Sequence, residues 1–157
     1  MLDILEALDS RIRIEKSLSS WEEAIKISGL LLKEDNIITQ QYIEKMINVA
    51  KQLGPYVVIA PGIAIPHARP EDGAKKFGLS LLVIKDGVSF NSHNDPVFLV
   101  LSFATPDSQS HLKFLQQLAT ILQNSTELVE KIRNTSSTDD IINYLKNLLS
   151  AEEEASA

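Results

Sequence analysis

The chain lacks cysteine and any long apolar segment. Because its 157 residues include no cysteine, disulfide bonds, thiolate metal sites and a cysteine nucleophile are excluded. No apolar run reaches the roughly 20 residues that a membrane-spanning helix needs. The opening stretch MLDILEALDS has acidic residues and no basic region ahead of an apolar one, so we expect no signal peptide. These absences favour a cytoplasmic protein without direct membrane insertion.

Positive charge is scarce as well. Fifteen Lys and Arg residues face 21 Asp and Glu residues, which gives a formal net charge of −6. Such a chain repels nucleic acid and anionic membrane surfaces on average. We therefore expect no nucleic-acid partner, and an acidic surface of this kind suits a basic protein partner instead.

The familiar nucleotide and hydrolase motifs are missing too. There is no Gly-x-x-x-x-Gly-Lys-Ser/Thr phosphate loop, no Gly-x-Gly-x-x-Gly fingerprint and no Gly-x-Ser-x-Gly elbow. We expect no cofactor. The candidates for chemistry are then the three histidines of the chain.

Hydrophobic periodicity predicts helices at both ends of the chain and strands between them. Asp86 and Gly87 favour a tight hairpin turn after the second strand, and residues 97–104 are almost continuously apolar, which is typical of a central strand covered on both faces. Residues 11–14 can add an edge strand. The predicted elements are helices over 19–35, 39–54, 110–123, 126–133 and 138–149, and strands over 56–60, 79–84 and 97–104.

This order predicts the fold class α/β, as a three-layer αβα sandwich with a central mixed β-sheet flanked by helices. The length suits one domain, which we place over residues 1–150. The segment 151-AEEEASA-157 is predicted to be an acidic disordered tail.

His67 follows a short apolar run and stands directly behind a proline. Pro66 fixes its own φ and biases Ile65 toward extended geometry, so the imidazole is presented from a stiff strand end. Gly62 and Gly73 bracket the segment and allow close backbone approach. The alternative interpretation is a partly exposed histidine in a turn.

His111 heads the apolar stripe of the helix predicted over 110–123. Ser108 or Ser110 can cap this helix, and its N-terminus offers N–H groups and partial positive charge to an anion. The alternative is a core histidine that bonds to backbone. His93 lies in the turn-rich stretch 91-NSHNDP-96 and is predicted to be a solvated turn residue.

A zinc site built from the histidines is the main rival constellation. The sequence has neither His-x-x-x-His nor His-Glu-x-x-His spacing, so a local metal motif is absent and we predict no metal ligands.

Two segments together resemble a known family. The motif 62-GIAIPH-67, followed by 110-SHL-112 at the start of an apolar helix, resembles the enzyme IIA domains of the mannitol/fructose class (type 2). These domains belong to the bacterial phosphoenolpyruvate-dependent sugar phosphotransferase system. The resemblance extends from 21-WEEA-24 to the last predicted helix.

The resemblance implies a phosphotransferase that works through a phosphohistidine. His67 would accept a phosphoryl group on Nε2 from the carrier HPr and pass it to a cysteine of enzyme IIB, which serves the membrane enzyme IIC. His111 would hydrogen-bond the phosphoryl group. No nucleotide or metal is implied, and a homodimer is compatible with the sequence.

Within this family, 54-GPYVVIAPGIAIPHARPEDG-73 is most similar to the L-ascorbate branch. Mannitol-type members carry an arginine at the position of Val49, so its role is either missing here or passed to Arg69 or Lys51. A transport component is favoured over a regulatory phosphoprotein of the same fold, and a histidine-ligated metal hydrolase is the alternative from another class. We expect Phe77, Phe90 and Ile63 to rim a shallow site.

Overall fold

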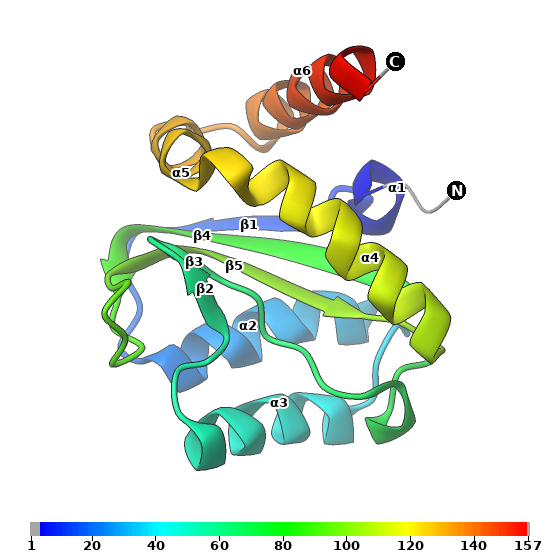
Figure 1. The fold of residues 1–157 in the computed structure, drawn as a ribbon. Helices are drawn as coiled ribbons and strands as arrows, with labels where there is room; N and C mark the ends of the chain where they lie inside the picture. Colours follow the sequence, from blue (N-terminus) through cyan, green and yellow to red (C-terminus); the bar gives the residue numbers. More distant parts are fainter. Residues whose placement is uncertain (1–3, 157) are drawn as a thin grey trace.

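The chain folds into a five-stranded mixed β-sheet between two layers of helices (Figure 1). The computed structural model describes residues 4–156, and side chains for residues 4–150. Neighbouring strands follow the order β1-β4-β5-β3-β2. The strands are β1 (Ile12–Glu15), β2 (Val58–Ala60), β3 (Ile63–Ala64), β4 (Gly78–Val88) and β5 (Val97–Ala104). The predicted α/β sandwich with a mixed sheet is confirmed.

Strand pairing combines both directions. β1 lies parallel to β4, and β3 lies parallel to β5. β4 and β5 are antiparallel, as are β2 and β3. β5 is therefore central, as its continuous apolar sequence predicted, and the 11–14 segment forms an edge strand at Ile12–Glu15.

Helices cover both faces of the sheet (Figure 1). One face carries α2 (Trp21–Glu34) and α3 (Gln40–Leu53), and the other carries α1 (Ile4–Leu8), α4 (Ser108–Ile121), α5 (Ser125–Arg133) and α6 (Thr138–Ser156). Short 3₁₀ turns occur at Pro70–Asp72 and Leu122–Asn124. Within residues 4–156, no helix is long and apolar enough to cross a membrane.

Alternation along β4 divides the interior into two cores. Leu79, Leu81 and Val83 pack toward α1, α4 and α6, whereas Leu82 and Ile84 pack toward α2 and α3. Successive side chains of a strand point to opposite faces. Because β4 is apolar at both sets of positions, helices pack against both of its faces. This packing holds in place the sheet that carries the site.

The hairpin turn predicted at Asp86 and Gly87 is wrong. β4 continues through both residues, and the Asp86 amide donates to Lys16 O at 2.8 Å. Gly87 has a φ of 74° and lies where the pairing register with β5 shifts, so it makes a bulge. A Cβ there would come within 2.9 Å of the Phe98 ring. The chain reverses later, where the Asp95 carboxylate accepts from Ser92 and Phe90 amides.

The last helix is longer than predicted. It was expected to end near residue 149, but α6 runs to Ser156. Residues 151–156 of the segment predicted as a disordered tail are thus helical, and residue 157 lies outside the described residues. Glu and Ala have high helix propensity, which explains why the segment 151-AEEEAS-156 continues the helix.

Candidate functional site

His67 is held by the backbone just before it. After Ala64 the chain leaves β3, and Pro66 supplies no amide hydrogen. The His67 Nδ1 lies 2.9 Å from Ile65 O. A carbonyl can only accept, so Nδ1 carries the proton and Nε2 of the neutral ring has a free lone pair. Among the described residues, no protein group hydrogen-bonds Nε2.

The ring of His67 stacks on a buried aromatic side chain. It stacks on Phe103 with a centroid separation of 4.6 Å and an interplanar angle of 25°. Phe103 lies in the central strand β5, is fully buried, and packs in turn on Phe114 of α4 at 4.7 Å. The stack and the Nδ1 hydrogen bond together fix the orientation of the imidazole at the edge of an open hollow.

His111 approaches the same place from α4. Its ring centroid lies 5.2 Å from that of His67. Its Nδ1 is 3.2 Å from the hydroxyl of buried Thr105. The family resemblance placed these two histidines in one candidate site, and the fold brings them together.

The predicted caps of α4 are wrong. The N-cap is Asp107, whose carboxylate accepts from the Ser110 amide at 2.7 Å and from the Ser110 hydroxyl at 3.0 Å. These hydrogen bonds lower the pKa of Asp107, so the carboxylate stays charged. Ser110 N–H is therefore engaged by the cap and is not available to a bound anion.

The two histidines border an open hollow of about 400 Å³. One wall comes from α3, with Lys45 and Val49, and a second comes from the segment Ala68–Asp72. Ser108 and Tyr56 complete the lining. The hollow mixes apolar walls with cations and carboxylates, and it opens to solvent where another macromolecule can reach the imidazole.

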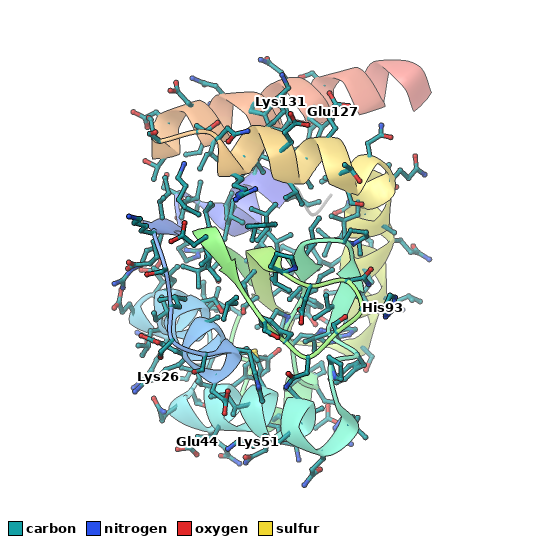
Figure 2. All side chains as sticks on the ribbon, turned by 90° about the vertical axis from the view of Figure 1, so that its left-hand side faces the viewer. Lys26, Glu44, Lys51, His93, Glu127 and Lys131 are labelled. Atoms are coloured by element: carbon teal, nitrogen blue, oxygen red, sulfur yellow. The ribbon has the colours of Figure 1, made fainter. Side chains whose placement is uncertain are left out.

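The cation that lines this hollow from a helix is Lys45. The sequence proposed Arg69 or Lys51 for such a role. Arg69 does line the hollow, but its Nε lies 3.6 Å from both Glu71 and Asp72 carboxylate oxygens. Lys51 borders a separate hollow beside Trp21 and points away from the molecule (Figure 2). Lys45 stands one helical turn before Val49, on the same helix face, and nothing in the sequence around it singled it out.

Burial favours the neutral form of both imidazoles. It lowers the pKa of His67, an effect that the Ile65 carbonyl opposes and that neighbouring His111 reinforces. Burial also lowers the pKa of His111. A neutral ring is the form that can attack an electrophile, so the site keeps His67 in its nucleophilic state.

His93 takes no part in this site. It is exposed in the turn between β4 and β5 and does not line the hollow (Figure 2), which confirms the solvated turn residue. Within the described part of the chain, no three His, Asp or Glu side chains come together as a metal-ligand set. The rival three-histidine arrangement is therefore not formed here.

The predicted apolar rim is wrong. Ile63 is fully buried, Phe90 packs against Trp21 at 6.1 Å, and Phe77 packs edge-on against Phe114 at 5.1 Å. Each has an apolar partner inside one of the two cores. The aromatic residue on which His67 stacks is Phe103, and no local signal distinguishes it from its neighbours in β5.

Comparison with known proteins points to one family. Residues 8–148 match the family described as "Phosphoenolpyruvate-dependent sugar phosphotransferase system, EIIA 2". The chain is 36% identical over 129 residues to the mannitol-specific cryptic phosphotransferase enzyme IIA component of Escherichia coli strain K12, covering 82% of this chain and 87% of that one. It is 32% identical over 141 residues to the ascorbate-specific PTS system EIIA component of the same strain, covering 88% and 91%.

Solved structures give the same result. The solution structure of the mannitol-specific cryptic enzyme IIA from Escherichia coli superposes with a TM-score of 0.79 at 35% identity, covering 89% of this chain and 98% of that one. The family match spans nearly all of the described fold, including both histidines. The chain therefore belongs to the EIIA 2 family of the phosphoenolpyruvate-dependent sugar phosphotransferase system.

Proposed function

We propose that His67 is the phosphoryl carrier of this phosphotransferase component, and that the protein works in the cytoplasm. The observation that carries the proposal is the hydrogen bond from Nδ1 to Ile65 O at 2.9 Å. This bond leaves Nε2 as the nitrogen with a free lone pair, on a ring that borders an open hollow. Proteins can therefore both deliver a phosphoryl group and remove it.

The transfer would proceed in two in-line steps. In the first, the Nε2 lone pair of His67 attacks the phosphorus of phosphorylated HPr. The old P–N bond breaks, and its electron pair returns to the HPr imidazole. In the second, a cysteine thiolate of enzyme IIB attacks the same phosphorus, and the pair of the P–N bond returns to His67. The proton stays on Nδ1 and remains hydrogen-bonded to Ile65 O throughout.

The surroundings can offset the incoming charge. A phosphoryl group brings roughly −1.5 to −2 charges. Lys45 and Arg69 line the hollow, and His111 lies beside His67. If the Thr105 hydroxyl donates to His111 Nδ1, the proton of the neutral ring is on Nε2 and can be donated to a phosphoryl oxygen. No nucleotide or metal is needed for either step.

The direct test is reconstitution of the relay. Purified protein is incubated with phosphoenolpyruvate, enzyme I and HPr, and then with candidate enzymes IIB. We expect one acid-labile phosphoryl group per chain, which is lost when the cognate IIB is added. A chain that acquires phosphate but gives it to no IIB would favour the regulatory alternative, and a chain that acquires none would refute the carrier role.

For the sugar we propose L-ascorbate, with a mannitol-type substrate as the alternative. The segment 54–73 is most similar to the ascorbate branch, and an apolar Val49 lines the hollow. The overall identities of 32% and 36% to an ascorbate and a mannitol relative do not separate the two. Ascorbate-type and mannitol-type IIB proteins, offered to the phosphorylated chain in parallel, would discriminate by their rates of phosphate uptake.

We expect His111→Ala to fold and to transfer phosphate slowly. His111 is partly exposed on α4, so its removal opens no large cavity, but one donor to the phosphoryl group is lost. Loss of one such donor lowers a rate by about 10²–10³-fold. Rapid-quench measurement of transfer from phosphorylated HPr tests this. His93→Ala is the matched control, and equal rates in wild type and His111→Ala would demote His111 to a packing residue.

The pKa of His67 predicts how the protein responds to acid. Because the folded-state pKa is lowered, the unfolded chain binds the proton first as the pH falls. The resulting stability is complete above the unfolded value of about 6.5 and is lost as the pH drops through the folded pKa. We expect the melting temperature of wild type to fall more steeply on acidification than that of His67→Ala. Parallel curves would contradict the assigned burial effect.

A further inference from the structure

We propose that Tyr42 is a positioning residue for His67, acting through the backbone on either side of the imidazole. This inference rests on the proposed carrier role of His67. Tyr42 lies in the first turn of α3 and is fully buried. Its hydroxyl reaches the two segments that hold the histidine, namely the chain after Pro66 and the end of β5.

The Tyr42 hydroxyl is a junction of hydrogen bonds. It accepts from the Ala68 amide at 3.0 Å. Its own proton can be donated to Phe103 O at 2.9 Å or to Ala68 O at 3.1 Å. A hydroxyl has one proton, so at any moment it donates to one of the two carbonyls. Burial raises the pKa of Tyr42, which keeps this proton in place at neutral pH.

This junction lies beyond the last residue pair of the ladder between β3 and β5. The ladder between β3 and β5 consists of Ile63 opposite Leu99 and Ala64 opposite Val100. Beyond it, one backbone bond joins the two segments, from the Phe103 amide to Pro66 O at 3.3 Å. The Tyr42 hydroxyl connects the two segments where the ladder hydrogen bonds between β3 and β5 no longer form.

Both partners of the hydroxyl are direct neighbours of the imidazole. Ala68 follows His67 in the chain, and Phe103 is the ring on which His67 stacks at 4.6 Å. Without the hydroxyl, the buried Ala68 amide and the Phe103 carbonyl would lose a partner, and buried unpaired groups are costly. The peptide between His67 and Ala68 would then shift, and with it the Nδ1 bond to Ile65 O.

The start of α3 is itself fixed to this segment. The Thr39 amide donates to Gly73 O at 3.1 Å. A Cβ on Gly73 would lie 2.2 Å from the Thr39 hydroxyl, so the two segments are in close contact. Tyr42 therefore reaches Ala68 from a helix whose first turn is held against the same segment of the chain.

The test compares Tyr42→Phe, which removes the hydroxyl and keeps the ring, with Ile43→Val. Ile43 is also buried on α3 but bonds to neither segment, so this control lowers stability without touching the junction. For Tyr42→Phe we expect the rate constant at saturating phosphorylated HPr to fall about tenfold, with KM unchanged because the docking surface is intact. Ile43→Val should change neither quantity.

A spectroscopic arm is independent of transfer. Nitrogen-15 spectra of the His67 side chain should show Nδ1 protonated in wild type and in Ile43→Val, and an increased share of the Nε2-protonated tautomer in Tyr42→Phe. Wild-type rate and wild-type tautomer in Tyr42→Phe would overturn the proposal. If wild type takes up no phosphate, the carrier role fails, but the tautomer comparison still decides whether Tyr42 positions the ring.

A measurement on wild type covers the case in which Tyr42→Phe does not fold. The buried Tyr42 hydroxyl proton should exchange slowly with solvent and show a nuclear Overhauser contact with the Ala68 amide. A rapidly exchanging hydroxyl, or an Ala68 amide that exchanges as fast as an exposed one, would contradict the junction.

Discussion

His67→Ala should take up no phosphate from phosphorylated HPr while keeping its fold. The imidazole borders an open hollow and is partly exposed, so its removal leaves the two cores intact. Among the described residues, no other histidine has an Nδ1 that donates to a backbone carbonyl and an Nε2 without a protein partner. The expected effect is complete loss of label, because the atom that forms the P–N bond is gone.

The matched control for this variant is His93→Ala, which removes an exposed histidine from the turn before β5. It should be phosphorylated like wild type. Radiolabel transfer measures both, and circular dichroism checks that both are folded. Label on folded His67→Ala would show that another residue accepts the phosphoryl group.

Phe103→Ala should cause the largest loss of stability of any single change at the site. Phe103 is fully buried in the central strand, and its ring contacts those of His67, His111 and Phe114. Truncating a buried Phe to Ala removes its transfer free energy and leaves a cavity, at a cost of about 3–5 kcal/mol. We also expect slow phosphoryl transfer, since His67 loses the surface on which it stacks.

Urea unfolding followed by tryptophan fluorescence measures the stability of this variant. Phe103→Leu is the comparison, because it keeps most of the apolar volume and removes only the flat ring. We expect Phe103→Leu to recover most of the free energy of unfolding but not the full transfer rate. Equal transfer by Phe103→Leu and wild type would mean that the stack contributes packing alone.

The fold was predictable because its signals are local and mutually consistent. The apolar run of β5 and the periodic helices on either side of the sheet predict the layers directly. The turn at Asp86 and Gly87 failed for a tertiary reason, because the Asp86 amide is bonded to Lys16 and the glycine serves a bulge. A dipeptide typical of turns does not reveal that its backbone is engaged by another strand.

The candidate site was predictable only in part. His67 and His111 each carry a signal in their own segment, a preceding proline and a helix start. Of the groups around them, Arg69 and Val49 are singled out by the family resemblance, whereas Tyr42 and Lys45 carry no such signal. Tyr42 reads as an ordinary core position of an amphipathic helix, and Lys45 reads as part of its solvated face. Their relation to the histidines depends on how α3 packs against the chain after β3, which periodicity does not specify.

The two imidazoles come from distant parts of the chain, because His67 follows β3 whereas His111 lies on α4. The Ala68 backbone next to His67 is hydrogen-bonded to Tyr42 of α3, below the sheet in Figure 1, while His111 belongs to α4, above it. A fragment that ends before α4 would retain the segment bearing His67 but lose its companion and the Phe114 ring beneath Phe103. Limited proteolysis between the layers would thus disable the pair even where each piece kept its own helices.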